Sequence, residues 1–190
     1  MNKNNICEIF NSIQGEGRET GMPATFIRFN NCNKDCYFCD TDFRAKGHIE
    51  KSLLSNVIFT GGEPFLFKED IVNFIKENKE KIFYGETNGS IFDKYLSKNI
   101  IWAISPKSVK DINIVKQLLD SNNKNYIKLV YNCSDFKEIF HELEEDYKER
   151  IYIQPQTLGN NFLDLQDCIN FVVENNLKIS SRLHLLWGLK

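Results

Sequence analysis

Residues 57–75 read VIFTGGEPFLFKEDIVNFI and contain one complete unit of the fold. The first four residues are apolar or β-branched, which is typical of a short buried strand, and two glycines end the run. From residue 68 to 79 the apolar positions fall on one face of a helix, namely Ile71, Val72, Phe74 and Ile75. The stretch therefore predicts a buried strand, a glycine turn and a helix with one apolar face.

Similar units recur on both sides of this stretch. Apolar, β-branched and aromatic runs predict further strands at residues 24–30, 82–86, 100–105, 126–131 and 150–154. Helical spacing predicts helices at residues 91–97, 111–120, 134–148 and 163–175. Alternating strands and helices form a parallel sheet, and about six strands suit a partial barrel better than a closed eight-fold one. We therefore predict an α/β fold, a partial (β/α)6-type barrel in one domain spanning residues 1–190.

The composition of the chain excludes several classes of protein. The 190 residues are 42% hydrophobic, so the chain can bury a core and is not expected to be disordered. The 24 Lys and Arg residues against 26 Asp and Glu residues give a formal charge of −2, without the basic surface of a nucleic-acid binder. There is no apolar run of bilayer length and no signal peptide, so we expect a cytoplasmic protein without a membrane partner.

Cys32, Cys36 and Cys39 form a C-x3-C-x2-C motif on a predicted loop. Cysteine thiolates are the usual ligands of iron–sulfur clusters and of structural zinc. Three such ligands leave one iron of a four-iron cluster open to an exchangeable ligand. The alternative is a zinc site with His48 as the fourth ligand, although zinc sites favour paired C-x2-C units and the chain has no second pair. The remaining cysteines, Cys7, Cys133 and Cys168, are expected to pack in the core.

Several motifs fall at the predicted carboxyl ends of the strands, where parallel α/β folds place their chemistry. They are Gly61-Gly62-Glu63, Thr87-Asn88-Gly89, Ser105-Pro106-Lys107 and Gln154-Pro155-Gln156. Because glycine lacks a Cβ, Gly61 and Gly62 allow a close approach of the backbone to a ligand. An ordinary strand-to-helix turn is the alternative for this glycine pair on its own.

The cysteine loop and the Gly61-Gly62-Glu63-Pro64 motif resemble those of the radical S-adenosylmethionine superfamily. Within it, the chain is similar nearly end to end to the 7-carboxy-7-deazaguanine synthase family. The stretches that carry the similarity are EIFNSIQGEG (8–17), GMPATFIR (21–28), the cysteine loop through Thr41, TGGEP (60–64), ETNG (86–89), SPK (105–107) and the tail around His184. One feature departs from the family, because only twenty residues separate Cys39 from Thr60. The first crossover helix is therefore expected to be shortened or missing.

The resemblance implies a radical-mediated ring contraction of 6-carboxy-5,6,7,8-tetrahydropterin to 7-carboxy-7-deazaguanine, with loss of ammonia, in queuosine or other deazapurine biosynthesis. It implies a [4Fe-4S] cluster on Cys32, Cys36 and Cys39, S-adenosylmethionine on the open iron, and Mg²⁺ on the Thr41 hydroxyl. It also implies a homodimer and an external electron donor of the flavodoxin or ferredoxin type.

The resemblance assigns the other site residues as well. Contacts to S-adenosylmethionine are expected from Phe38, Cys39, Asp40, Gly61, Gly62, Glu63, Gly89, Ser105, Pro106, Lys107, Gln154, Pro155, Gln156 and Thr157. Contacts to the substrate are expected from Ile13, Gln14, Gly15, Glu16, Arg28, Thr87, His184 and Lys190, the last through the terminal carboxylate. The Glu63 carboxylate is expected to face the cofactor's ammonium group. Arg28 is expected to bind the substrate carboxylate, with a structural ion pair as the alternative.

Two other functions remain as alternatives at this point. One is a glycyl-radical-activating enzyme of the same superfamily, which would share the cluster but act on a protein. The other is a zinc-binding interaction module without catalytic activity.

Overall fold

The computed structural model describes residues 1–39, 41–42, 46–159 and 161–189. Its main sheet has the strand order β1-β2-β3-β4-β5-β6-β7-β10, in which β1 and β2 are antiparallel and every other pair is parallel. The strands are β1 (Ile6–Ile13), β2 (Pro23–Phe29), β3 (Asn56–Gly61), β4 (Ile82–Thr87), β5 (Ile101–Ile104), β6 (Tyr126–Val130), β7 (Ile151–Gln154) and β10 (Lys178–Ile179). A separate antiparallel hairpin consists of β8 (Thr157–Leu158) and β9 (Asn161–Phe162).

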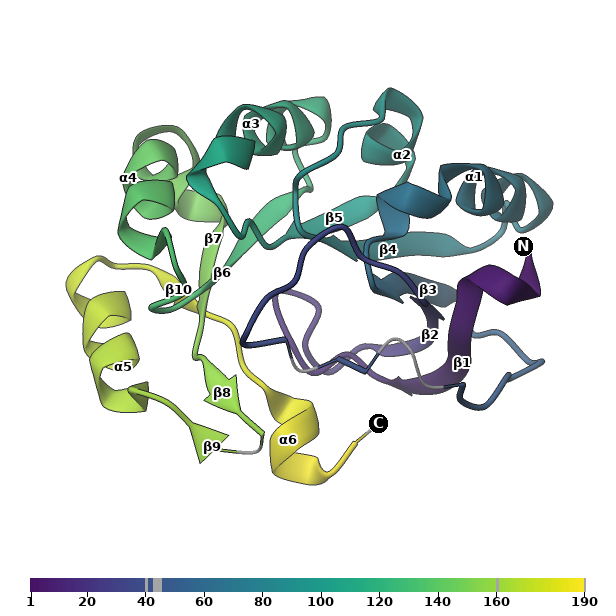
Figure 1. Ribbon diagram of the computed structural model, residues 1–190, viewed down its shortest axis with the longest axis horizontal. Helices are drawn as coiled ribbons and strands as arrows, with labels where there is room; N and C mark the ends of the chain where they lie inside the picture. The colour runs from purple at the N-terminus through teal and green to yellow at the C-terminus, as the bar shows by residue number, and fades with distance from the viewer. Residues whose placement is uncertain (40, 43–45, 160, 190) are drawn as a thin grey trace.

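The helices lie outside the curve of the main sheet. Figure 1 shows α1 to α5 in an arc around the strands, with α6 and the C-terminus at the open side. Their bounds are α1 (Lys68–Glu77), α2 (Lys94–Asn99), α3 (Ile112–Ser121), α4 (Phe136–Tyr147), α5 (Leu165–Glu174) and α6 (Leu183–Trp187). Short 3-10 helices cover Lys3–Asn5, Pro64–Phe67, Val109–Asp111 and Lys148–Arg150. This arrangement confirms the predicted α/β fold, a mostly parallel sheet curved into a partial barrel.

The prediction of about six strands omitted β1 and β10. β1 has the sequence ICEIFNSI, in which polar side chains interrupt the apolar pattern, and it forms the antiparallel edge of the sheet. β10 contains two residues and, among the described strands, pairs with β7 alone. β1 therefore lacks the regular period that marks a strand in a sequence, and β10 is too short to show one.

No helix connects β2 and β3 in the described part of the chain, in agreement with the predicted loss of the first crossover helix. Instead, residues 47–50 run along the outer side of β1. Gly47 N donates to Cys7 O at 2.9 Å, Ile9 N donates to His48 O at 2.8 Å, and Glu50 N donates to Ile9 O at 2.8 Å. The short connection therefore pairs with the edge of the sheet.

The core fills the space between the sheet and its helices. Ile127 and Leu129 of β6 are fully buried there with Trp102, Phe59 and Ile71. Because neighbours along a strand point to opposite faces of a sheet, Lys128 between them points to the inner side. The outer face of the sheet thus forms the core, and the inner face supplies the polar side chains of the site.

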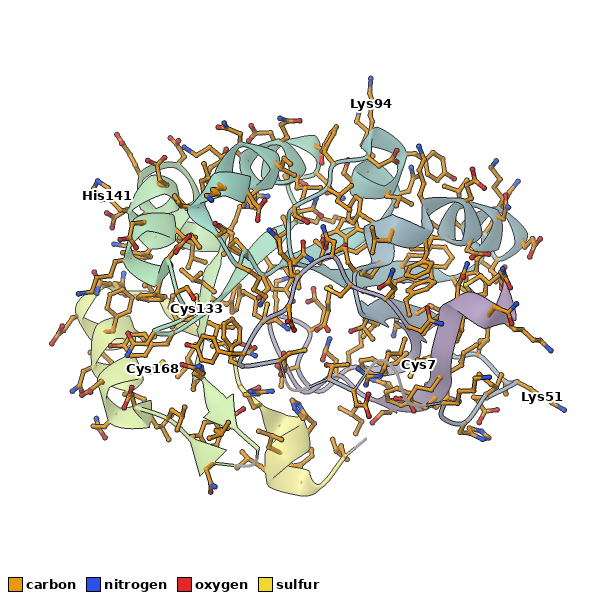
Figure 2. The ribbon with its side chains drawn as sticks, viewed as in Figure 1. Cys7, Lys51, Lys94, Cys133, His141 and Cys168 are labelled. Carbon is orange, nitrogen blue, oxygen red and sulfur yellow. The ribbon has the colours of Figure 1, made fainter. Side chains whose placement is uncertain are left out.

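Cys7, Cys133 and Cys168 are buried, as predicted, and all three are free thiols. Figure 2 shows Cys7 far from the other two, so the three do not form a common metal site. His141 and Lys94 project outward from their helices in the same view. Among the described helices, none has the length and apolar character needed to cross a membrane.

Candidate active site

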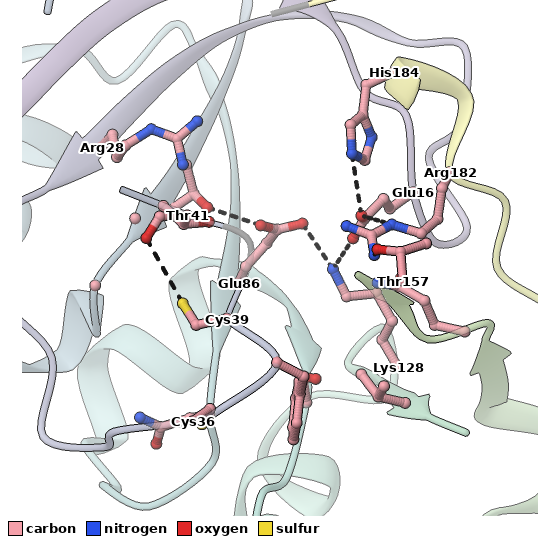
Figure 3. Close-up of a pocket in the computed structure, with 18 of the residues that line it drawn as sticks. Glu16, Arg28, Cys36, Cys39, Thr41, Glu86, Lys128, Thr157, Arg182 and His184 are labelled. Atoms are coloured by element: carbon pink, nitrogen blue, oxygen red, sulfur yellow. Dashed lines mark hydrogen bonds and ion pairs between the residues drawn. The ribbon is translucent and has the colours of Figure 1, made fainter. Parts of the chain in front are cut away.

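A cavity of about 790 Å³ opens on the inner side of the curved sheet. Its walls include β1 and the stretch after it, the cysteine loop, the carboxyl ends of the parallel strands, the β8 hairpin and the tail (Figure 3). The carboxyl ends of parallel strands meet at one edge of the sheet, which explains why motifs distant in sequence come together here.

Most of the predicted site residues line this cavity. From the metal and cofactor set these are Cys32, Cys36, Phe38, Cys39, Thr41, Gly61, Gly62, Ser105, Lys107, Gln154, Gln156 and Thr157. From the substrate set they are Ile13, Gln14, Gly15, Glu16, Arg28, Thr87 and His184. Glu63, Gly89, Pro106 and Pro155 do not line it. Asp40 and Lys190 lie outside the described residues.

Glu63, whose carboxylate is expected to face the cofactor, is not among the residues that line the cavity. The side chain is fully buried and accepts hydrogen bonds from Phe65 N at 3.1 Å, Thr87 Oγ1 at 2.8 Å and Asn88 N at 2.7 Å. Burial raises the pKa of Glu63 to about 7, although these hydrogen bonds oppose the rise. The carboxylate therefore joins the end of β3 to the end of β4.

Gly89 and Thr87 are also engaged by the protein itself. Gly89 has a φ of 72°, and a Cβ there would lie 2.9 Å from both Ile104 Cγ2 and Val115 Cγ2, so this glycine packs on the core. The Thr87 hydroxyl donates to Glu63 and accepts from Gly89 N at 3.1 Å. Both residues shape the turn after β4. Pro106 and Pro155 do not line the cavity themselves, but the residues on either side of each in the sequence do.

The glycine pair at the end of β3 holds the start of the cysteine loop. Gly62 N donates to Phe29 O at 3.0 Å, and Glu63 N donates to Asn31 O at 2.7 Å. A Cβ on Gly62 would lie 1.7 Å from Asn31 O, so only glycine fits at this point. The loop therefore leaves β2 in direct backbone contact with the glycine turn, next to Cys32.

Cys32, Cys36 and Cys39 all line the cavity, as does Lys107, whose positive charge acts on Cys36. Burial raises the pKa of Cys36, while the Lys107 charge opposes that rise. Lys107 Nζ donates to Ser105 Oγ at 2.8 Å and lies 5.2 Å from the centre of the Phe38 ring. Burial lowers the pKa of Lys107, and the nearby Cys36 opposes this shift. The positive charge is therefore placed to stabilise anionic groups at the cysteine loop.

The donor set of this loop fits an iron–sulfur cluster. Cys32, Cys36 and Cys39 supply three thiols at one cavity wall, and cysteine thiolates are the usual ligands of such clusters. In a cluster each cysteine binds a different iron, so its ligands lie further apart than those of one ion. His48, the proposed fourth zinc ligand, does not line the cavity, and its imidazole lies 3.8 Å from the Glu50 carboxylate.

The opposite wall carries a buried ionic network that the sequence did not predict. Lys128 Nζ lies 2.5 Å from Glu16 Oε2 and 3.1 Å from Glu86 Oε1. Glu16 Oε1 is 3.2 Å from Arg182 Nε and 3.7 Å from His184 Nε2 (Figure 3). Glu86 also accepts from Thr60 Oγ1 at 2.7 Å and from Gln14 Nε2 at 3.4 Å. The network thus joins the stretch after β1, β3, β4, β6 and the tail.

The network fixes the charges of its members. Burial alone would raise the pKa of Glu16, but Lys128 and Arg182 outweigh it and lower the pKa to about 2. Burial would likewise lower the pKa of Lys128, but the two carboxylates raise it above its ordinary value. For His184, burial lowers the pKa although Glu16 opposes the shift. Near neutral pH Glu16 is therefore a carboxylate and Lys128 an ammonium group.

Arg28 also lines the cavity, on the side of Thr41 (Figure 3). Its Nε donates to Glu8 Oε1 at 2.8 Å, and its guanidinium lies 5.5 Å from the centre of the Phe10 ring. Glu8 is the one acceptor of an Arg28 hydrogen bond that the described residues provide. The structural ion pair is therefore present, and it uses Nε.

Comparisons with known proteins agree with this geometry. A comparison with protein-family profiles finds no match. The 7-carboxy-7-deazaguanine synthase of Bacteroides thetaiotaomicron is 34% identical over 174 residues, which cover 86% of this chain and 87% of that protein. The Haemophilus influenzae protein of that name is 34% identical over 78% of this chain and 72% of its own length. The crystal structure of QueE from Escherichia coli has the same fold, with a TM-score of 0.67 at 23% identity, over 94% of this chain and 93% of that one. The chain is thus an enzyme that belongs to the 7-carboxy-7-deazaguanine synthase family.

Proposed function

We propose that the chain contracts the ring of 6-carboxy-5,6,7,8-tetrahydropterin to give 7-carboxy-7-deazaguanine with loss of ammonia. The observation that carries this proposal is the shared cavity, in which the three-cysteine loop faces a wall of fixed charges on the inner side of the sheet. The cavity draws residues from the first strands to the tail, which supports the proposal that residues 1–190 act as one domain.

Cys32, Cys36 and Cys39 would hold the [4Fe-4S] cluster, and the glycine turn would hold S-adenosylmethionine. When bound, these groups supply the radical that removes a hydrogen atom from the substrate, which no side chain can do. Gly61 and Gly62 line the cavity next to the cysteine loop, where their backbone would contact the cofactor. Lys107, next to Ser105, would bind the cofactor's carboxylate.

The charged wall would bind the pterin. Arg28 would bind the substrate carboxylate through its guanidinium group, which also holds Glu8 through Nε. Gln14 and Glu16 carry donors and acceptors suited to the amide and amino edges of a pterin. With a pKa of about 2, Glu16 stays ionised and acts as an acceptor at every physiological pH.

Three further features are proposed from the family resemblance. Thr41 lines the cavity beside Cys39 and would bind Mg²⁺, a cation that prefers oxygen ligands. A protein electron donor would reduce the cluster, and two copies of the chain would form a homodimer. Each feature can be tested separately. Magnesium titration tests the Mg²⁺ site, reduction with flavodoxin or ferredoxin tests the electron donor, and the molar mass in solution tests the homodimer.

The decisive experiment is anaerobic reconstitution with iron and sulfide, followed by turnover of the pterin with S-adenosylmethionine, reductant and Mg²⁺. A brown protein that forms 7-carboxy-7-deazaguanine is the expected result. A brown protein that cleaves S-adenosylmethionine but leaves the pterin unchanged would contradict the substrate and favour a protein substrate. A colourless protein that holds zinc without labile sulfide would contradict the proposed catalytic function altogether.

A further inference from the structure

Asn88 brings a second polar side chain to the cysteine loop. It follows β4 and is 7% exposed. Its Nδ2 lies 3.8 Å from Cys32 Sγ, within hydrogen-bonding range for sulfur, and 2.9 Å from Asn33 Oδ1. The side chain therefore reaches from the sheet to the first cysteine of the motif.

The surroundings of Asn88 fix the orientation of its amide. Oδ1 accepts from Ser90 N at 3.0 Å and from Ser90 Oγ at 2.5 Å, so the nitrogen must face the cysteine loop. Ser90 Oγ also accepts from Asn33 Nδ2 at 2.8 Å, which closes a ring of three side chains. An asparagine amide has two N–H hydrogens. Asn33 takes one of them, and the other is directed at Cys32.

The backbone of Asn88 is anchored as firmly as its side chain. Its N–H donates to Glu63 Oε2 at 2.7 Å, and Glu63 is fully buried. The carboxylate that ties β3 to β4 thus also fixes the distance between Asn88 and the loop. A contact held in this way does not depend on a mobile side chain.

We propose that Asn88 is a positioning residue that donates an N–H···S hydrogen bond to Cys32 and thereby raises the reduction potential of the cluster. The inference rests on the proposed function, because it needs Cys32 to be a cluster ligand. Reduction adds negative charge to the cluster and its sulfur ligands, so a donor stabilises the reduced state more than the oxidised state. Asn88 would therefore make the cluster easier to reduce.

The test is the midpoint potential of the reconstituted cluster, measured by redox titration with electron paramagnetic resonance in the absence of S-adenosylmethionine. Asn88→Ala should disfavour reduction about tenfold, a shift of roughly 59 mV to more negative potential for one electron. The matched control is Asn170→Ala, which removes an exposed asparagine on α5 and should leave the potential unchanged.

A second variant keeps Asn88 in place. Ser90→Ala removes the hydroxyl that orients the amide but retains the Ser90 N–H, so it should shift the potential in the same direction by less. Equal potentials for wild type, Asn88→Ala and Ser90→Ala would overturn the inference. If Asn88→Ala takes up no cluster, the Ser90→Ala potential decides by itself. A wild-type protein without any cluster would instead refute the proposed function, and the inference with it.

Discussion

Lys128 shows how one buried cation organises the cavity. Its Nζ lies within 3.1 Å of two carboxylates, and those carboxylates come from segments far apart in sequence. Because each charge has an opposite partner, Lys128 and Glu16 stay ionised although both are buried. The cavity wall therefore keeps fixed charges that need not rearrange when a polar substrate binds.

Replacing this cation tests its role in stability. Lys128→Met should lower the free energy of unfolding by about 3 kcal/mol, because Glu16 and Glu86 then face each other without the charge between them. Urea denaturation of the unloaded protein measures the change. Lys124→Met, an exposed lysine near the same strand, should change it by less than about 0.5 kcal/mol. Addition of Glu86→Gln to Lys128→Met should restore part of the loss, and its failure to do so would argue against charge repulsion as the cause.

Ionised Glu16 stabilises the fold, and this stabilisation is lost at acid pH. Its pKa falls from an ordinary 4.5 to about 2, so its contribution is complete above pH 4.5 and is lost as the pH falls towards 2. The contribution amounts to about 3 kcal/mol. The free energy of unfolding of Glu16→Gln should therefore change less between pH 4.5 and 2 than that of wild type. The exposed Glu142→Gln should follow the wild-type curve, and parallel curves for all three proteins would exclude this assignment.

Elements with a regular period could be predicted from the sequence, and those without one could not. α3 and α5 lie within two residues of their predicted ranges at both ends, because each has a continuous apolar face. α2 starts three residues later than predicted, because the Asp93 side chain accepts from Tyr95 N and Leu96 N and caps the helix there. β1 was missed because Glu8, Asn11 and Ser12 interrupt its apolar residues.

The site divides in a similar way. The cysteine loop and the strand-end motifs were predicted because they are local patterns, and most of them line the cavity. Lys128, Glu86 and Arg182 were missed because their partners lie in other elements. The available signal was a lysine inside the apolar strand YIKLV, which only a buried partner makes tolerable. The direction of the Glu63 carboxylate depends on three donors around it and cannot be deduced from its motif.

The contact between the glycine turn and the cysteine loop can be tested at a single atom. In Gly62→Ala the new Cβ would lie 1.7 Å from Asn31 O, so one of the two segments must move. We expect a loss of about 2–3 kcal/mol in stability and a clear fall in iron bound after reconstitution. The control is Gly159→Ala. Gly159 has a φ of +58°, and no atom lies within 4 Å of the position of a Cβ, so this substitution adds only backbone strain. Equal iron content in the two variants would contradict a role of this contact in placing the loop.

At the scale of the whole molecule, the tail and the stretch after β1 close the cavity together. Leu183 N donates to Gly15 O at 2.9 Å, Ser181 Oγ donates to the same oxygen at 3.1 Å, and Gly17 N donates to Ser180 Oγ at 2.8 Å. His184 lies against Gly15 and pairs with Glu16. The stretch after β1 and the tail therefore form one wall of the site together.

Gly15→Ala should separate these two segments. Its Cβ would lie 2.7 Å from His184 Nδ1 and 2.8 Å from His184 N, so the tail must shift. We expect the KM for the pterin to rise at least about tenfold, a loss of roughly 1.4 kcal/mol in binding, while the cluster content stays the same. Limited proteolysis should cut the tail of the variant sooner. Gly21→Ala, with no atom within 4 Å of its Cβ, serves as control, and an equal KM in both variants would contradict the closure.

The segment that replaces the first crossover helix also protects the sheet from neighbouring molecules. An exposed strand edge offers unpaired N–H and C=O groups to which another chain can add a strand. On the β1 side, backbone groups of Cys7 and Ile9 already bond to residues 47–50, and on the other side β10 is only two residues long. Edge-to-edge aggregation of folded copies through β1 would first require residues 47–50 to detach, so the shortened connection also guards the chain against fibril growth.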